Sequence, residues 1–306
     1  MSQPKPIQGV CVFMATPLLP DGALDLARTR EHAADLVARG VHGITLFGST
    51  GSNGSFTEVE KAQLLAATLE GVAGRVPVML GIGSITTAET IRLARMAAAE
   101  GADAVLAVPI NYWTPTPREL VRHYRSAADA TALPFWIYNN PGLAGVDIPP
   151  DLVAEIAASP TVCGIKESSG DYGRILRIPE LTRGQVGVGA GYETFVVEPL
   201  ALGAAAWFCG VGNIIARDCV AVWDAAKAGD YATAFDIQAR IFPLCDLLGR
   251  YGHVRVAADA LRLIGRAVGP ARPPLLPLDG AALAEVQAAL GRVLGPQALS
   301  EPIAAE

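Results

Sequence analysis

The 306-residue sequence has no block of consecutive lysines and arginines, and its net charge is only −6. A nucleic-acid-binding surface needs clustered basic residues, so we expect no nucleic-acid partner. The five cysteines are scattered without a CxxC pair, and the four histidines form neither an HxH nor an HExxH motif. These spacings predict no metal site and no disulfide framework, and they are typical of a protein in a reducing compartment.

Long apolar segments are also rare, and residues 195–216 form the one stretch that is apolar enough to suggest a membrane span. This stretch contains Glu198, Pro199 and Asn213 together with several glycines, so a helix, a strand and a loop fit it better. The first ten residues lack the apolar segment of a signal peptide. We therefore expect a cytoplasmic protein without a membrane partner.

Short apolar runs recur along the first two thirds of the chain. They do not alternate with polar residues, which is typical of parallel strands that are covered on both faces. The predicted strands are Val10–Ala15, Gly43–Phe47, Val76–Gly81, Ala104–Val108, Phe135–Tyr138, Val162–Lys166, Val186–Gly189 and Ala205–Cys209.

Longer amphipathic stretches separate these runs, as at residues 25–39, 87–100 and 116–130, and Thr57 and Glu60 form a capping box before another helix. Eight strands that each precede a helix predict the α/β class and a (β/α)₈ TIM barrel. An open doubly wound sheet is the alternative, although it usually has fewer strands. We expect a catalytic barrel over residues 1–215.

The rest of the chain, residues 216–306, is predicted to form a C-terminal helical extension that packs on the barrel. Its expected helices are Ala221–Ala228, Tyr231–Leu248, Val254–Val268 and Ala281–Leu294, and the proline-rich residues 270–274 separate the last two.

In such barrels, sites form at the carboxyl ends of the strands. The residues expected there include the loop Ser49-Thr50-Gly51, Tyr112, Tyr138 and Lys166. Neither a carboxylate pair nor a metal cluster accompanies them in the pattern. The sequence therefore places one lysine, two tyrosines and a hydroxyl-rich loop on one face.

Lys166 is open to two interpretations, because a lysine at the end of a strand is often a solvated surface residue. A buried and unprotonated lysine amine is instead a nucleophile toward carbonyl groups. Tyrosine and serine hydroxyls could relay the protons that formation of an imine requires, and the loop at Ser49 could bind a substrate carboxylate. Taken singly, this loop could be an ordinary connection and Tyr138 a packed strand residue.

Four motifs occur in order along the chain: Ala15-Thr16-Pro17, Gly48-Ser49-Thr50-Gly51, Tyr138-Asn139-Asn140-Pro141 and Gly164-Ile165-Lys166-Glu167-Ser168. Through them the sequence resembles the dihydrodipicolinate synthase / N-acetylneuraminate lyase family of class I aldolases. The resemblance implies a (β/α)₈ barrel with a C-terminal helical extension. It also implies a homotetramer that is assembled as a dimer of dimers.

The resemblance assigns roles to individual residues. Lys166 corresponds to the lysine that forms an imine with pyruvate or another 2-oxo acid, so no cofactor is expected. Tyr138 corresponds to the general acid/base, and Ser49 and Thr50 to the pair that holds the substrate carboxylate. Tyr112 corresponds to the tyrosine that reaches the site of a neighbouring subunit. The remaining match is Gly191, which corresponds to the glycine whose carbonyl group faces the site.

Other positions depart from the pattern of the synthases. Leu143 stands where the synthases carry the arginine that binds the carboxylate of aspartate semialdehyde, and a leucine cannot make that bidentate contact. Ala144 replaces the usual threonine, Ser52 a glutamate and Asn111 the first tyrosine of a pair. These changes concern the second substrate rather than the 2-oxo acid.

From these residues we predict a Schiff-base-forming lyase that acts on 2-oxo acids. The first expectation is aldol cleavage, yielding pyruvate, or dehydration of a 2-oxo-3-deoxy sugar acid. The alternative is 4-hydroxy-tetrahydrodipicolinate synthase, which condenses pyruvate with aspartate semialdehyde. A third possibility is a barrel that binds a sugar acid without turnover.

Overall fold

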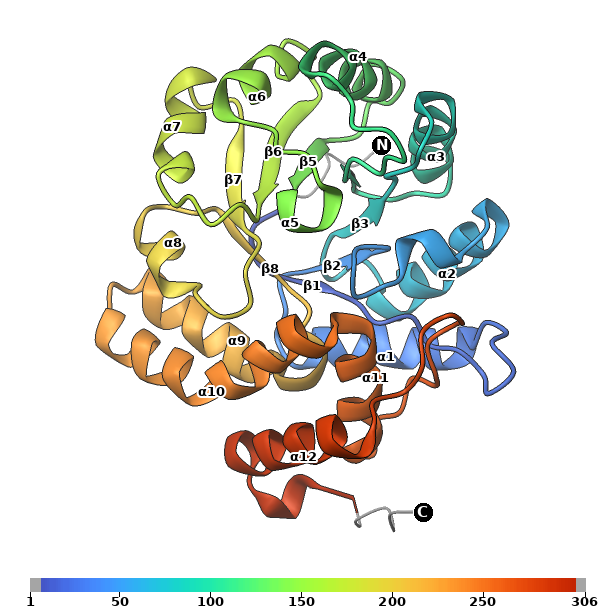
Figure 1. The fold of residues 1–306 in the computed structure, drawn as a ribbon, viewed down its shortest axis with the longest axis vertical. Coiled ribbons are helices and arrows are strands. Elements are labelled where there is room, and N and C mark those ends of the chain that lie inside the picture. Colours follow the sequence, from blue (N-terminus) through green and yellow to red (C-terminus); the bar gives the residue numbers. More distant parts are fainter. Residues whose placement is uncertain (1–6, 301–306) are drawn as a thin grey trace.

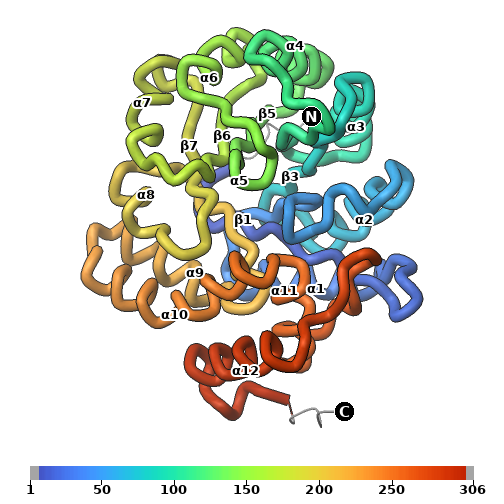
Figure 2. The backbone as a smooth tube through the Cα atoms, viewed as in Figure 1, coloured from blue at the N-terminus to red at the C-terminus, as the bar shows by residue number. Residues whose placement is uncertain are grey.

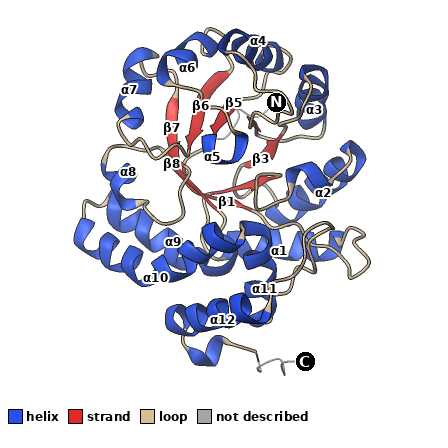
Figure 3. Ribbon diagram, viewed as in Figure 1, coloured by secondary structure: helices blue, strands red, loops and turns tan. Residues whose placement is uncertain are grey.

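A computed structural model describes residues 7–300 of the chain. Eight parallel strands close into a barrel in chain order, so that β1 pairs with both β2 and β8. Helices surround the strands (Figures 1 and 3). The predicted (β/α)₈ barrel is therefore confirmed. The strands are β1 (Gly9–Phe13), β2 (Gly43–Leu46), β3 (Val78–Gly81), β4 (Ala104–Ala107), β5 (Phe135–Asn139), β6 (Val162–Glu167), β7 (Gly187–Ala190) and β8 (Ala206–Cys209).

Each predicted strand is found within two residues of its expected bounds. The helices that follow them are α1 (Leu26–Ala38), α2 (Glu58–Val72), α3 (Thr87–Ala99), α4 (Pro117–Ala128), α5 (Pro141–Ala144), α6 (Pro150–Ile156), α7 (Arg174–Leu181), α8 (Val197–Ala201) and α9 (Gly212–Lys227). Residues 7–300 also contain two short 3₁₀ helices, η1 (Asn53–Ser55) and η2 (Pro296–Ala298).

Side chains fix where several of these helices begin. Thr57 accepts a hydrogen bond from the backbone N–H of Glu60, whose carboxylate accepts from Thr57 in return, so the predicted capping box is present. Thr116 and Glu119 form a second capping box at α4, with Pro117 at the first helical position. These contacts satisfy backbone donors that the first turn of a helix leaves free.

Large aromatic side chains fill the inside of the barrel where the neighbouring strand carries glycine. A Cβ atom on Gly164 would lie 2.3 Å from the ring of Trp136, and one on Gly189 would lie 2.5 Å from the ring of Phe208. Trp136 and Phe208 in turn form an edge-on pair with ring centroids 5.2 Å apart. Below the site, the barrel is thus a packed core rather than a channel.

The C-terminal helices α10 (Tyr231–Tyr251), α11 (His253–Leu263) and α12 (Gly280–Leu294) pack together beside α9, on one side of the barrel (Figures 1 and 2). Gly252 separates α10 from α11 with φ of 92°, a backbone conformation that favours glycine. The chain therefore turns sharply there, and His253 becomes the first residue of α11.

Two helix bounds differ from the prediction by five residues or more. The helix expected from Ala221 begins at Gly212, because the residues read as a loop after β8 already form its first turn, with non-helical angles at Ile215. The expected boundary between residues 215 and 216 lies within this helix, α9. The helix expected to reach Val268 ends at Leu263.

Residues 195–216 contain α8, β8 and the start of α9, so the expected helix and strand are present and α9 begins where a loop was expected. Across residues 7–300, none of the helices combines the length and the apolar composition that crossing a membrane requires.

Candidate active site

Lys166 is buried at the carboxyl end of β6, with only 5% of its surface exposed. Its Nζ atom lies 4.0 Å from the ring centroid of Phe13 and 4.1 Å from that of Tyr138. Aromatic faces stabilise an ammonium group without forming a covalent or ionic bond to it. The interpretation of Lys166 as a solvated surface residue is therefore excluded by its position.

Tyr138 stands directly beside Lys166, because β5 and β6 pair in parallel with these two residues opposite each other. The Tyr138 hydroxyl lies 3.4 Å from Oγ of Ser49 and accepts a hydrogen bond of 3.1 Å from Nδ2 of Asn140. Strands β5 and β6 and the loop after β2 thus bring together a lysine, a tyrosine and a serine, as predicted.

The surroundings of Tyr138 affect its ionisation in opposite directions. Burial raises the pKa of the phenol, whereas the nearby Lys166 ammonium lowers it. Hydrogen bonds to Ser49 and Asn140 lower the pKa further, and the net pKa lies below the usual value of a tyrosine. A phenol of this kind can give up and recover a proton more readily than one in water.

The loop after β2 presents Ser49 and Thr50 to the same cavity. Thr50 is 3% exposed, and the carbonyl oxygen of Gly51 accepts a hydrogen bond of 3.1 Å from Thr16. This bond ties the loop to the end of β1. Gly51 does not line the cavity itself. A Cβ atom on Gly51 would lie 3.0 Å from the carbonyl oxygen of Met14.

Gly191 follows β7 and lies against Lys166. A Cβ atom at this position would lie 2.9 Å from Cε of Lys166 and 1.9 Å from Oγ of Ser168, so any side chain would displace the lysine. The carbonyl oxygen of Gly191 accepts a hydrogen bond of 3.2 Å from Ser168. The structure thus places Gly191 in the cavity wall, where the resemblance puts it.

A cavity of about 260 Å³ joins these groups at the carboxyl end of the barrel. Half of its wall comes from residues that the sequence analysis named as site residues, and the other half from residues that it did not. Its lining consists of Phe13, Ser49, Thr50, Tyr138, Asn140, Gly142, Leu143, Lys166, Gly191, Glu193, Gly210 and His253.

Glu193 and His253 are the ionisable residues of this wall that the sequence analysis missed. Glu193 follows β7 by three residues, so its position after a strand was a usable signal. His253 belongs to none of the motifs in the sequence. It reaches the cavity from α11 in the C-terminal extension, which no barrel pattern could indicate.

Leu143 and Tyr112 occupy different places. Leu143 is 63% exposed on α5 and lines both the 260 Å³ cavity and a neighbouring one of about 410 Å³. Tyr112 is 84% exposed and packs edge-on against Trp113, away from Lys166, in a separate hollow of about 330 Å³. Within this single chain, Tyr112 therefore does not join the other predicted site residues.

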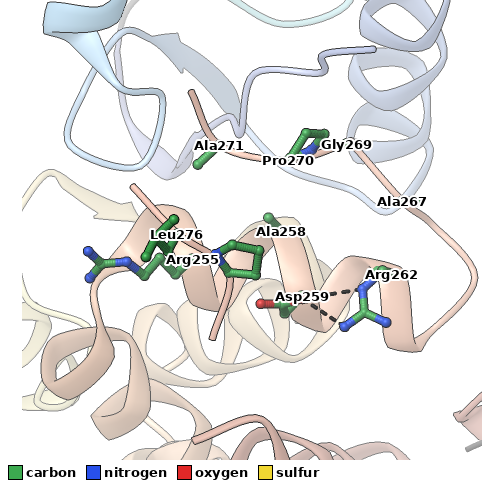
Figure 4. A pocket seen from close by; sticks show the side chains of 10 residues that line it. Arg255, Ala258, Asp259, Arg262, Ala267, Gly269, Pro270, Ala271 and Leu276 are labelled. Atoms are coloured by element: carbon green, nitrogen blue, oxygen red, sulfur yellow. Dashed lines mark hydrogen bonds and ion pairs between the residues drawn. The ribbon is translucent and has the colours of Figure 1, made fainter. Parts of the chain in front are cut away.

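Another hollow, of about 360 Å³, lies between α11 and residues 267–277 (Figure 4). Arg262, one of two arginines that line it, donates to Asp259 over 2.8 Å, and Asp259 also accepts from the backbone N–H of Leu278 over 3.0 Å. These groups hold the extension together and include no nucleophile. Across residues 7–300, histidine, cysteine and acidic side chains nowhere gather in threes as metal ligands would.

A sequence model described as the Dihydrodipicolinate synthetase family matches residues 6–293. The chain belongs to this family. Its relatives include a 4-hydroxy-tetrahydrodipicolinate synthase from Methanospirillum hungatei JF-1, which is 37% identical over 271 residues and covers 88% of this chain and 93% of its own. Another, from Stenotrophomonas maltophilia, is 35% identical and covers 96% of this chain and 99% of its own.

Solved structures agree with the sequence relatives. A putative dihydrodipicolinate synthetase from Pseudomonas aeruginosa superposes with a TM-score of 0.90 at 32% identity, covering 94% of this chain and all of its own. The chloride-inhibited dihydrodipicolinate synthase from Acinetobacter baumannii, solved with pyruvate, gives a TM-score of 0.90 at 30% identity and covers 94% and 99%.

Family membership confirms that the chain is an enzyme of the class I, Schiff-base-forming aldolases and lyases, and that it acts on small molecules. The names of the relatives support the synthase, which the sequence analysis gave as its alternative, better than the sugar-acid lyase that it gave first.

Proposed function

We propose that this chain is a 4-hydroxy-tetrahydrodipicolinate synthase, which condenses pyruvate with L-aspartate 4-semialdehyde through an imine on Lys166. One observation carries the proposal: the buried amine of Lys166 lies 4.1 Å from the ring centroid of Tyr138, whose hydroxyl is hydrogen-bonded to Ser49. Relatives that are 35–37% identical carry the name of this synthase.

The first half of the reaction uses Lys166 and Tyr138. The unprotonated amine attacks C2 of pyruvate, and the carbinolamine loses water to give an imine. Tyr138 supplies the proton that leaves with the hydroxyl group as water. Its phenolate then removes a proton from C3 of the imine, and the resulting enamine attacks the aldehyde carbon of the second substrate. Ser49 and Asn140 stabilise the phenolate between these transfers.

The carboxylate of pyruvate is assigned to the loop that carries Ser49 and Thr50. Hydroxyl groups and backbone N–H groups bind a carboxylate without adding a fixed positive charge near Lys166. Thr50 is buried in the cavity wall, so its hydroxyl is held in a single environment. This arrangement keeps the carboxylate close to Lys166 and orients C2 toward its amine.

A second candidate is the cleavage or dehydration of a 2-oxo-3-deoxy sugar acid. The observation that favours it is Leu143, an exposed and uncharged residue at the cavity edge, because the cavity lining contains no arginine to bind a second carboxylate. Both candidates share the imine on Lys166 and differ only in the second substrate.

Reduction with borohydride in the presence of pyruvate tests the imine. We expect a covalent adduct on the peptide that contains Lys166 and none on the peptide that contains Lys61, which is also buried. An adduct that persists in Lys166→Ala would overturn the proposal. Turnover of L-aspartate 4-semialdehyde, compared with pyruvate release from 2-oxo-3-deoxy sugar acids, then decides between the two reactions.

We also propose a cytoplasmic homotetramer, assembled as a dimer of dimers, in which Tyr112 contacts a neighbouring subunit. The exposure of Tyr112 and Trp113 supports an interface at this surface. Tyr112 is 84% exposed and Trp113 is 75% exposed, and the two rings pack against each other. A related structure is described as a monomeric variant of the synthase, so assembly needs its own measurement. Light scattering on the purified protein, with Tyr112→Asp as the variant, provides it.

A further inference from the structure

Glu193 and His253 form a pair in the cavity wall that the proposed reaction leaves unused. Oε1 of Glu193 lies 3.5 Å from Nε2 of His253. Glu193 comes from the segment after β7 and His253 from the first turn of α11, so the pair joins the barrel to its C-terminal extension. Both residues line the same 260 Å³ cavity as Lys166.

The Glu193 carboxylate is held rigidly and stays ionised. It accepts hydrogen bonds from the backbone N–H groups of Gly210 and Val211, and its side chain is only 10% exposed. Burial raises the pKa of this carboxyl group, but the contact with His253 and the two backbone donors outweigh burial and place the pKa below its usual range. The cavity wall therefore carries a fixed negative charge.

His253 has one ring nitrogen directed to this charge and one without a protein partner. In the neutral tautomer that carries its proton on Nε2, facing Glu193, Nδ1 is an acceptor. Among residues 7–300 no hydrogen bond to Nδ1 of His253 is found, and the side chain is 33% exposed to the cavity. His253 can therefore accept a hydrogen bond from a ligand.

Gly210 lies between the Glu193–His253 pair and the side chain of Thr50. A Cβ atom on Gly210 would lie 3.2 Å from Oε1 of Glu193, 3.2 Å from Cδ2 of His253 and 2.5 Å from Oγ1 of Thr50. These three side chains thus surround one small volume that only a glycine leaves open. A ligand that is bound at Thr50 lies next to the pair.

The charges of the cavity favour one kind of second substrate. Once the protonated imine on Lys166 has become the neutral enamine that attacks the second substrate, the lining residues provide the Glu193 carboxylate and the His253 acceptor, and no arginine. A second carboxylate would approach Glu193 without a cation to compensate for it, which is unfavourable at low solvent exposure. An ammonium or hydroxyl group would instead meet two acceptors.

We propose that Glu193 and His253 bind the second substrate through a hydrogen-bond donor, either an ammonium or a hydroxyl group, and that its carboxylate contributes little to recognition. This inference rests on the proposed function, because it takes pyruvate bound at Lys166 as given. It makes His253 a specificity-determining residue that the C-terminal extension supplies to the barrel.

Four aldehydes test the proposal with pyruvate as the common partner. L-Aspartate 4-semialdehyde has an ammonium group and a carboxylate, succinate semialdehyde only the carboxylate, glyceraldehyde only hydroxyl groups, and propanal neither. Pyruvate consumption gives kcat/KM for each aldehyde. We expect kcat/KM for L-aspartate 4-semialdehyde to exceed that for succinate semialdehyde, and kcat/KM for glyceraldehyde to exceed that for propanal. Each ratio should be about tenfold to a hundredfold, because hydrogen bonds to charged groups have this strength. Equal rates with succinate semialdehyde and L-aspartate 4-semialdehyde would overturn the proposal.

Variants locate the preference. We expect His253→Ala to reduce kcat/KM for the two donor-bearing aldehydes toward the level of their matching aldehydes, and Glu193→Gln to reduce the preference for ammonium more than that for hydroxyl. Arg255→Ala, on the same helix but outside this cavity, is the control. An equal loss with all four aldehydes in His253→Ala would show a purely structural role and overturn the inference.

Borohydride trapping tests imine formation separately from recognition of the second substrate. A pyruvate adduct at Lys166 in His253→Ala shows that the variant is folded and that the first half-reaction is intact, so its aldehyde rates report on the pair alone. Failure of the wild-type protein to form the adduct would overturn the proposed function, and the inference with it. An adduct without any donor preference would overturn the inference only.

Discussion

Asn140 connects the catalytic tyrosine to the segment that shapes the cavity edge. Its Nδ2 donates to the hydroxyl oxygen of Tyr138 over 3.1 Å, while its Oδ1 accepts from the backbone N–H of Leu143 over 3.2 Å. The second bond caps α5, the short helix that carries Leu143. One amide side chain therefore influences both the ionisation of Tyr138 and the position of the residue that replaces an arginine.

The substitution Asn140→Asp separates these two effects. An aspartate keeps the cap on α5 but cannot donate to Tyr138, and its negative charge disfavours the phenolate. The hydrogen bond from Asn140 lowers the pKa of Tyr138, so its loss raises that pKa. We expect kcat to fall by about two- to tenfold and its rise with pH to shift to higher pH. A pH profile with an unchanged midpoint would contradict this role of Asn140.

Tyr138→Phe removes the hydroxyl group but keeps the ring over Lys166. Because only proton transfer is lost, we expect kcat to fall by about 10²- to 10⁴-fold, while pyruvate still binds. Stopped-flow or quenched borohydride trapping should show slow formation of the adduct at Lys166. Tyr124→Phe is the matched control, since its hydroxyl donates to the carbonyl oxygen of Ala107 and it does not line the cavity. Similar losses in both variants would contradict the assignment.

The sequence predicted the barrel and the residues around Lys166 because both follow from strand order. Lys166 and Tyr138 each stand one residue before the end of their strands, β6 and β5, and consecutive parallel strands place such residues side by side. Ser49 was found for the same reason. The part of the site that depends on strand ends could therefore be read from the chain.

The other part of the site depends on packing between distant segments. His253 comes more than forty residues after β8, and its position requires the turn at Gly252 and the docking of α10 and α11. Asn213, in the first turn of α9, is a second example. Its buried side chain donates to the carbonyl oxygen of Phe13 over 2.8 Å and accepts from the backbone N–H of Ala15 over 2.9 Å. No local pattern specifies contacts across such separations.

Gly191→Ala tests how closely the cavity fits around Lys166. The added Cβ would lie 2.9 Å from Cε of Lys166, so the lysine or β7 must move. We expect a loss of about 1–3 kcal/mol in the free energy of unfolding, together with loss of the pyruvate adduct. Gly187→Ala, at the start of β7, is the control, because its Cβ would have no contact closer than 3.8 Å. Equal activity of the two variants would contradict the predicted fit.

Arg272 binds the proline-rich segment of the extension to the loop beside the active site. It donates to the carbonyl oxygen of Ser55 over 2.7 Å and forms an ion pair with Glu60. The hydrogen bond from Arg272 lowers the pKa of the Glu60 carboxyl group, and burial raises it by less. The pKa of Glu60 therefore falls from 4.5 to about 2. A carboxyl group whose pKa is lowered by folding stabilises the fold when the pH is above its pKa in the unfolded chain. This stabilisation is lost as the pH falls through its pKa in the folded protein.

We therefore expect Glu60→Gln to be less stable than the wild-type protein by about 0.5–1 kcal/mol at neutral pH, since the pair is partly exposed. A glutamine still accepts from the backbone N–H of Thr57, so the capping box of α2 is kept. The difference should be complete above pH 4.5 and disappear as the pH falls toward about 2. Urea unfolding at a series of pH values measures it, with Glu31→Gln as the control, because Glu31 pairs with Arg28 at an exposed site. If the difference in the free energy of unfolding does not depend on pH, the amide disturbs packing. The charge of Glu60 would then not be what holds Arg272 and its segment against the loop.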